Sequence, residues 1–303
     1  MRPKIFLWTK RAHDMNWVAY ERAKSIAGAL SLLDQAGGGG RVIAGGTDLM
    51  LQLRQREYRP DLLVDITGIE ELKHIREDDG WIQIGAAVTH AEVAKNSLIQ
   101  KEARALAEGC ARVGSPQIRN MATLVGNVIS AQPAADGAIP LMALEAEIKV
   151  ASKAGERWIS MEETYRGVGV SSVDASREVA TMVRFKKLGG KGQTRFFRMC
   201  RRKALALPML NGAVVILLDS SWKRIQEARI ALGPVAEKPF RPKDAEAYLQ
   251  SREISPEIIL EAARIASVQA NPRTSLLRGS DIYRKEMIRI FLARTIQDLL
   301  GGR

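Results

Sequence analysis

The 303-residue chain is long enough for two or three domains. Its composition, 46% hydrophobic and 26% charged, is ordinary for a globular protein, and no apolar run reaches the roughly eighteen residues of a membrane span. The formal net charge of +12 is spread along the chain without a nucleic-acid-binding motif, so we expect no nucleic-acid partner, and docking against acidic proteins explains the charge better. Two cysteines, Cys110 and Cys200, cannot ligate an iron–sulfur cluster, and no Cys/His spacing indicates zinc, so we expect no metal site.

The beginning of the chain carries little structural signal. Residues 1–15 contain several positive charges and the apolar run Ile5–Trp8, which is too short for the hydrophobic region of a secretory signal. We expect an N-terminal extension there, either a tail or a partner contact, and a cytoplasmic location.

A glycine turn follows the first predicted strand. Ser25 is a typical N-cap for a helix that Gly37–Gly40 ends, and Arg41–Ala44 is a short apolar strand. Two glycines, a helix over Leu49–Arg54 and a strand over Leu62–Asp65 follow, which predicts a small parallel unit. A strand, a glycine turn and a helix N-terminus present N–H groups to a pyrophosphate. Neither the Rossmann fingerprint nor a P-loop is present.

The stretch Ser115–Asp136 combines small residues with polar groups in a similar way. Its first two residues, Ser-Pro, predict a helix start, and Thr123 leads into a strand-like run interrupted by Gly126 and Asn127. The carboxylate of Asp136 suits a ring N–H or a ribose hydroxyl. By itself the pattern fits a tight structural turn as well as a ligand loop.

Between and after these stretches the pattern predicts short helices and an antiparallel sheet. The expected helices begin at Thr89, span Lys101–Cys110 and span Pro133–Leu144, and the expected strands are Trp81–Gly85, Glu147–Ala151, Arg157–Ile159 and Val179–Phe185. The segment Gly189–Gly192, flanked by lysines, is the best candidate for a domain boundary.

Beyond this boundary, strands precede helices. The expected strands are Arg195–Met199, Met209–Leu218 and Ile225–Ala231, and the expected helices are Lys243–Gln250, Pro256–Val268 and Ile282–Leu300. In the last helix an apolar stripe recurs at helical spacing, formed by Ile288, Leu292, Ile296 and Leu299.

The two glycine-containing motifs together resemble the FAD-binding, medium-sized subunit of the molybdenum hydroxylase family. Ala44–Leu49 reads AGGTDL, as in the family's first flavin loop, and Thr123–Val128 with Gln132–Asp136 is similar to its TIGGNI…SPAAD pattern. Because two motifs occur in the right order, the resemblance is specific, and it covers nearly the whole chain. Val125 replaces the first glycine of GGN and Gln132 the serine of SPAAD, changes that would alter flavin contacts or loop width without removing the site.

The resemblance implies an α+β fold. Its first part is a two-part FAD-binding domain of the vanillyl-alcohol-oxidase or PCMH-like type, with a small βαβ unit and a mixed or antiparallel sheet with helices. A C-terminal three-stranded antiparallel sheet with a helical bundle follows. We predict FAD-binding subdomains at 16–77 and 78–190 and a C-terminal domain at 191–303.

The resemblance also implies which residues contact FAD. The pyrophosphate is expected against the first loop, whose glycines lack the Cβ atoms that would block it. The predicted binding residues of this loop are Val42, Ile43, Ala44, Gly45, Gly46, Thr47, Asp48 and Leu49. Those of the second loop are Thr123, Gly126, Asn127, Ser130 and Asp136, with Asp136 the strongest polar candidate.

Two further positions align with ring contacts of relatives. Ala180 matches a backbone contact, and Arg198 falls where several relatives have a lysine near the isoalloxazine, although Arg201 and Arg202 are equally close in sequence. A cation there would stabilise negative charge on the reduced ring, and a solvated basic strand is the alternative.

The implied function is electron transfer by an oxidoreductase subunit without catalytic acid–base residues of its own. In the family, a large subunit hydroxylates substrate at a molybdenum cofactor and a small subunit carries two [2Fe–2S] clusters. FAD on the medium subunit receives the electrons and passes them to NAD⁺, a quinone or another acceptor. Both other subunits are therefore expected partners, for example in a dimer of heterotrimers.

Two alternatives stay open from sequence. A stand-alone flavin oxidoreductase of the same fold would need a substrate-facing acid or base near the flavin, and the sequence offers no candidate. A non-catalytic scaffold that has lost FAD would be colourless after purification. The flavin spectrum separates these classes.

Overall fold

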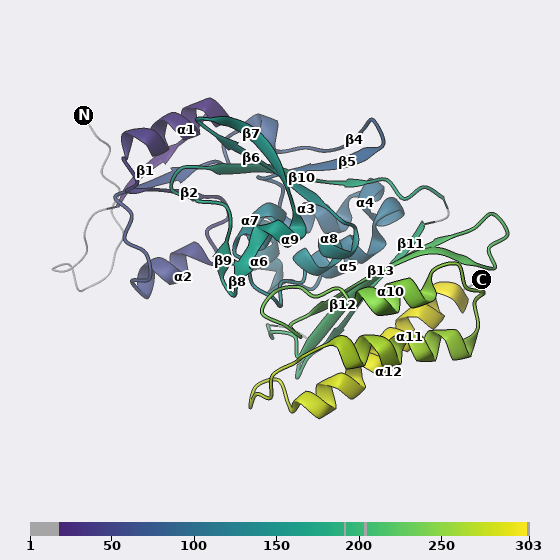
Figure 1. Ribbon diagram of the computed structural model, residues 1–303. Coiled ribbons are helices and arrows are strands. Elements are labelled where there is room, and N and C mark those ends of the chain that lie inside the picture. Colours follow the sequence, from purple (N-terminus) through teal and green to yellow (C-terminus); the bar gives the residue numbers. More distant parts are fainter. Residues whose placement is uncertain (1–17, 191, 203–204, 302–303) are drawn as a thin grey trace.

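The structure, a computed structural model, describes residues 18–190, 192–202 and 205–301 and has an α+β architecture (Figure 1). The predicted N-terminal extension, 1–15, lies outside the described residues. None of the described helices combines the length and apolar character that a membrane span requires.

The first sheet is small and parallel. Its strand order is β1 (Ala19–Arg22), β3 (Leu62–Asp65) and β2 (Gly40–Ile43), and α1 (Ile26–Gln35) packs against β2 and β3. Helix α2 (Leu49–Arg54) follows β2. The predicted parallel unit is confirmed, while β1 was not predicted, because its sequence AYER lacks a run of apolar residues.

The second sheet is antiparallel and has five strands. Its order is β4 (Ile75–Asp78), β5 (Trp81–Gly85), β10 (Val179–Lys186), β6 (Glu147–Ser152) and β7 (Gly155–Ser160). The four strands predicted for this region are confirmed. Strand β4 was missed, and the predicted subdomain division between 77 and 78 falls inside it.

A 3₁₀ helix leads from β3 into this second sheet, and short α-helices and a hairpin connect its strands. They are η1 (Glu70–Leu72), α3 (His90–Lys95), α4 (Ser97–Glu102), α5 (Arg104–Cys110), α6 (Pro116–Met121), α7 (Leu124–Ile129), α8 (Ala138–Ala143), α9 (Met161–Thr164), β8 (Tyr165–Gly167) and β9 (Val170–Ser171).

Two predicted helices have different bounds in the structure. The helix predicted over Lys101–Cys110 is wrong as one element, because Ala103 leaves the helical region (φ −146°, ψ 56°) and separates α4 from α5. The helix predicted from Pro133 begins only at Ala138. The intervening residues form turns, in which the N–H of Ala135 donates to the carbonyl of Gln132 at 3.1 Å.

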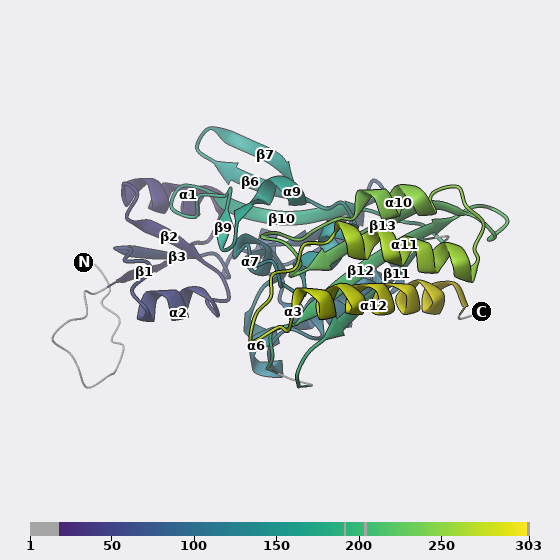
Figure 2. The same cartoon turned by 60° about the horizontal axis from the view of Figure 1, so that its bottom comes forward.

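The third sheet is antiparallel and carries three helices, as Figure 2 shows. Its strands are β11 (Gly192–Met199), β12 (Leu210–Leu218) and β13 (Ile225–Gly233), and the helices are α10 (Lys243–Leu249), α11 (Pro256–Gln269) and α12 (Asp281–Gly301). The predicted strand–helix order is confirmed. The predicted division at 190/191 lies just before β11.

Strand β12 joins the two halves of the molecule through its alternating side chains. Ala213 and Val215 belong to the core shared with the FAD-binding half, whereas Val214 and Ile216 belong to the core beneath the C-terminal helices. Helices α5 and α8 pack on the first face, and α12 packs on this sheet together with α10. Since successive side chains of a strand point to opposite faces, one strand closes both cores.

Candidate functional site

The first loop leaves β2 with open backbone donors. Among the described residues, the N–H groups of positions 45–49 donate to no carbonyl or side-chain oxygen. Residues 44–47 are half-buried and Asp48 is exposed, so these donors are accessible. A run of unpaired N–H groups next to a glycine turn binds anionic oxygens.

The predicted reason for the two glycines is wrong. A Cβ at Gly45 would lie 2.0 Å from the carbonyl oxygen of Met121, so this glycine makes room for neighbouring backbone and not for a ligand. Gly46 has φ +67°, a left-handed conformation that favours glycine. A Cβ added there would point toward the side chains of Ile43 and Met50. The two glycines therefore shape the turn and seat it.

The contact at Gly45 brings the two predicted loops together. Met121 and Ala122 directly precede Thr123, and a Cβ at Gly45 would lie 2.8 Å from the Cα of Ala122. Segments almost eighty residues apart in sequence thus pack backbone to backbone. The two loops that carry the family motifs therefore lie side by side.

The second loop is the start of a helix. The strand-like reading after Thr123 is wrong: Thr123 is the N-cap of α7, and its hydroxyl oxygen accepts the N–H of Gly126 at 3.1 Å. Thr123 is 3% exposed, so its side chain is part of the support of the loop. Threonine is a common N-cap residue, and its side chain accepts an N–H of the first helical turn. The apolar residues on both sides of Gly126 resemble a strand and obscured this helix start.

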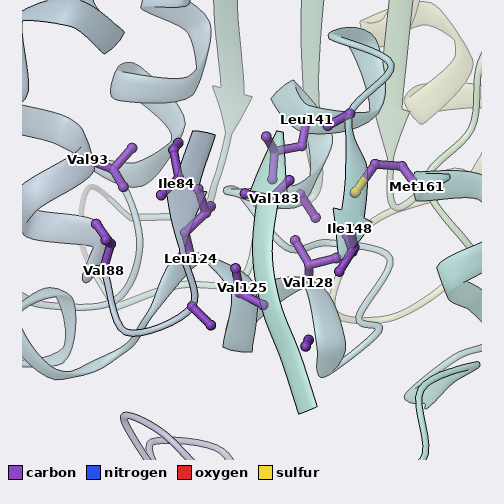
Figure 3. Packing of buried hydrophobic residues seen from close by; sticks show 14 of the residues in the cluster. Ile84, Val88, Val93, Leu124, Val125, Val128, Leu141, Ile148, Met161 and Val183 are labelled. Atoms are coloured by element: carbon purple, nitrogen blue, oxygen red, sulfur yellow. The ribbon is translucent and has the colours of Figure 1, made fainter. Parts of the chain in front are cut away.

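Helix α7 turns its apolar side into the core. Figure 3 shows Leu124, Val125 and Val128 among the buried side chains, together with Val183 of β10. Val125, the departure from the family's glycine, is 2% exposed. Its extra carbons therefore pack in the core, whereas Gly126 is exposed and Asn127 and Ile129 are half-buried.

Asn127 and Ser130 form a polar corner on the accessible side of α7. The Oδ1 atom of Asn127 accepts the N–H of Gly137 at 3.2 Å, and its Nδ2 has no partner among the described residues. The hydroxyl of Ser130 donates to the carbonyl of Asn127 at 2.9 Å. One amide donor is thus left for a ligand.

Asp136 lies in a buried charge network. Its Oδ2 accepts from Nε of Arg198 at 2.9 Å, and its Oδ1 accepts from Nδ2 of Asn211 at 2.8 Å. The side chains of Asp136 and Arg198 are 6% and 10% exposed. Burial raises the pKa of the Asp136 carboxyl to about 6, although the positive charge of Arg198 acts in the opposite direction.

The network unites two predicted residues and adds a third. Asp136 and Arg198 come from different halves of the chain, and both oxygens of Asp136 already have protein partners. Asn211 was missed, although an asparagine at the start of the apolar strand β12 is a usable signal. Arg201 and Arg202 donate to the carbonyls of Leu276 and Leu205, so Arg198 is the arginine of this group that pairs with a buried carboxylate.

The remaining predicted residues surround the two loops. Val42 donates its N–H to the carbonyl of Ala175 at 2.9 Å, and Asp48 occupies the N-cap position of α2 without a capping hydrogen bond. Ala180 is 9% exposed and lies on β10, which packs against α7. Ala180 therefore belongs to the sheet beneath the second loop and not to the loop itself.

A buried histidine lies under the second loop and was also missed. His90 is 0% exposed, and neither ring nitrogen has a hydrogen-bond partner. A Cβ at Gly137 would lie 2.9 Å from its Cε1 atom. Burial lowers the pKa of His90 to about 4, so the ring is neutral at pH 7. The sequence gives no indication of its position, because no motif surrounds this histidine.

Comparison with known proteins agrees with this geometry. Residues 14–185 match the family described as FAD binding domain in molybdopterin dehydrogenase, and residues 195–299 match the CO dehydrogenase flavoprotein C-terminal domain. The chain belongs to the FAD-binding subunits of the molybdenum hydroxylases. Members of this family are oxidoreductase subunits, and in homologous complexes the molybdenum cofactor and the iron–sulfur clusters belong to partner subunits.

Individual relatives of this flavoprotein family align over nearly their whole length. The nicotinate dehydrogenase FAD-subunit of Eubacterium barkeri is 28% identical, with 86% of this chain and 88% of the relative covered. The 6-hydroxypseudooxynicotine dehydrogenase complex subunit alpha of Paenarthrobacter nicotinovorans is 33% identical, with 93% and 94% covered. A chain of carbon monoxide dehydrogenase from Hydrogenophaga pseudoflava has a TM-score of 0.87 at 26% identity, with 94% and 97% covered.

The residues of this chain fit a bound flavin dinucleotide. Open N–H groups at 45–49 suit the pyrophosphate, and the left-handed turn at Gly46 is needed to present them. Within the described residues, no group of three or more His, Cys, Asp or Glu side chains could hold a metal ion.

Proposed function

We propose that this chain binds FAD between its two loops and serves as the electron relay of a multi-subunit molybdenum hydroxylase. When bound, FAD supplies the redox chemistry by exchanging electrons with [2Fe–2S] clusters and with NAD or another acceptor. The residues of this chain bind the cofactor, orient it and set the charge around it.

One observation carries the proposal. The glycine turn with open N–H groups packs directly on the segment that starts α7, with Gly45 against Met121. Accessible N–H groups that the turn does not use itself are free to donate to anionic oxygens of a ligand. Donors held open beside a second polar loop fit a ligand with both phosphates and polar ring edges.

The proposed roles follow from the position of each group. The N–H groups of the first loop and the hydroxyl of Thr47 bind the pyrophosphate, while the amide of Asn127 and the hydroxyl of Ser130 face the rest of the dinucleotide. Thr123 and Gly126 shape the start of α7. The remaining predicted contacts of the first loop and sheet are Val42, Ile43, Ala44, Asp48, Leu49 and Ala180.

Asp136 and Arg198 have a proposed electrostatic role. The pair holds one positive and one negative charge in a fixed geometry, at 2.9 Å, beside the second loop. A fixed cation stabilises negative charge that develops on a reduced ring, which makes reduction easier. Asn211 holds the carboxylate in place from the other side.

The proposed assembly contains a molybdenum-cofactor large subunit and an iron–sulfur small subunit, arranged as a dimer of heterotrimers in the cytoplasm. The net charge of +12 supports docking against acidic partners. Subdomains at 16–77 and 78–190 and a C-terminal domain at 191–303 are the proposed division of the chain.

The test is the FAD content of the variant Asn127→Asp. This change keeps the oxygen that accepts from Gly137 and removes the open amide donor, so the fold is preserved while a ligand hydrogen bond is lost. We expect FAD to bind about tenfold more weakly, since losing a hydrogen bond and adding a negative charge near phosphates costs about 1.4 kcal/mol or more. Flavin absorbance after dialysis against graded FAD measures the affinity.

The matched control is Asn120→Asp, the same change at an exposed position of α6. It should leave the FAD content unchanged. If wild-type protein neither carries nor takes up FAD, the relay function is wrong and a scaffold role replaces it. Equal affinity in both variants would remove Asn127 from the site.

A further inference from the structure

A cavity lies at the edge of the second loop, where residues of both halves of the chain meet. Its volume is about 570 Å³, within the range of small-molecule sites. It is lined by Gln132 and Pro133 of the second loop and by the segment that leads into α12. Three arginines line this cavity: Arg273, Arg278 and Arg284.

Arg284 is a buried cation with neutral partners. It is 2% exposed, and its guanidinium donates to the carbonyls of Met209, Arg273 and Pro234, the first two at 3.1 Å. No carboxylate of the described residues pairs with it. Burial, followed by the charge of Arg278, lowers its pKa to about 10, so the group stays charged at pH 7 without a counter-ion.

The other two arginines of the cavity are also unpaired. The side chains of Arg273 and Arg278 form no ion pair and no hydrogen bond with any described residue. Glu237 lines the cavity too, but it is exposed and pairs with none of the three. Other arginines of the chain do have carboxylate partners, for example Arg241 with Glu246 at 2.8 Å.

We propose that this cavity binds the phosphate group of a small molecule. Three guanidinium groups around one cavity supply more positive charge than a single carboxylate neutralises, and guanidinium geometry matches phosphate oxygens in a bidentate way. The hydroxyl of Ser275 also lines the cavity and can donate to a remaining oxygen, whereas the hydroxyl of Thr274 already donates to the carboxylate of Asp281 at 2.8 Å.

The ligand is either free inorganic phosphate or the phosphate end of a nucleotide, since both present the same oxygens to the arginines. The volume is large enough for a nucleotide. Because the three carbonyl bonds of Arg284 also join separate segments, replacing Arg284 would disturb the fold. Arg278 and Arg273 are therefore the positions to vary.

The experiment is calorimetric titration of the FAD-loaded full-length protein with inorganic phosphate and, separately, with ADP, at constant ionic strength set by chloride. We expect saturable phosphate binding with a dissociation constant below about 1 mM. Arg278→Gln and Arg273→Gln should each weaken it about tenfold or more, because each removes a charge-assisted hydrogen bond. Tighter binding of ADP than of phosphate identifies a nucleotide site, and equal binding identifies a site for the phosphate group alone.

The matched control is Arg294→Gln, which removes an exposed arginine of α12 that does not line the cavity. It should bind phosphate like the wild type. Heat that does not saturate, or equal weakening in all three variants, overturns the proposal, because both indicate general attraction to a basic surface. FAD content measured on the same samples keeps this outcome separate from the relay function.

Discussion

The two loops that meet at Gly45 and Met121 use their polar groups in opposite ways. In the first loop the N–H groups of 45–49 have no acceptor among the described residues, whereas most polar atoms of the second loop form hydrogen bonds within the protein. Thr123 caps α7, Ser130 bonds to the backbone, and Asp136 is held by two side chains. In the proposed function, the first loop is therefore the main binding surface and the second is largely its support.

This difference explains how a loop with open N–H groups keeps its shape. A loop with unsatisfied donors gains little from its own hydrogen bonds, so its shape must come from packing against a segment that is already satisfied. The contact of Gly45 with the backbone before Thr123 provides that packing. The predictions below disturb this arrangement, beginning with the largest expected effect.

The largest effect is expected for Gly45→Val, which separates the two loops. Even the first added carbon would lie 2.0 Å from the carbonyl oxygen of Met121, so backbone must move. We expect the free energy of unfolding to fall by about 3 kcal/mol or more, together with loss of FAD. Urea unfolding and flavin absorbance measure the two effects. Gly190→Val, at an open position, is the control and should change neither.

The second prediction tests the internal network of the second loop. Asp136→Asn keeps the shape but leaves the buried Arg198 without a carboxylate, so we expect a loss of about 3 kcal/mol in the free energy of unfolding. Chemical denaturation measures it. Glu261→Gln, which removes an exposed partner of Arg264, should have no measurable effect. Equal effects of both changes would mean that the buried network is not a support.

The third prediction concerns pH and the histidine under the second loop. His90 has a pKa of about 4 when folded and about 6.5 when unfolded, so between these values the unfolded chain binds the proton and acid destabilises the protein. Asp136 acts with the opposite sign below pH 6, because its folded pKa is raised to about 6.

The variant His90→Leu removes the histidine contribution. Between pH 6.5 and 4.5 the stability of the wild type should fall by about 2–3 kcal/mol relative to this variant. The measured quantity is the difference between the two unfolding curves at each pH. A difference that stays flat from pH 7 to 4.5 would show that His90 is not held neutral.

The smallest effect is expected for Gln132→Ser, which restores the family's serine. Gln132 is exposed, so we expect the free energy of unfolding to change by less than about 0.5 kcal/mol and the affinity for FAD to stay within about twofold. Equilibrium dialysis with FAD measures the latter. A tenfold change would place Gln132 in direct contact with the flavin and extend the binding surface into the second loop.

Local sequence patterns predicted most of the fold because they act over a few residues. Ser25, Thr89 and Ser115 are helix caps as expected, and strands such as Leu62–Asp65 followed from short apolar runs. The misread cases have competing local signals. Thr123 caps a helix whose glycine and β-branched residues resemble a strand. Pro133 is followed by a turn, which is held in place by a hydrogen bond from Asn211 to the carbonyl of Ala134.

The sequence by itself determined the two polar glycine motifs, their family and the order of the sheets, since these depend on residue type and spacing along the chain. Only the tertiary structure decided that Gly45 serves packing, that Asp136 pairs with Arg198 and Asn211, and that three arginines share one cavity. These pairings join residues far apart in sequence. Their energies depend on burial and on which groups the fold brings into contact, and neither quantity is encoded in local spacing.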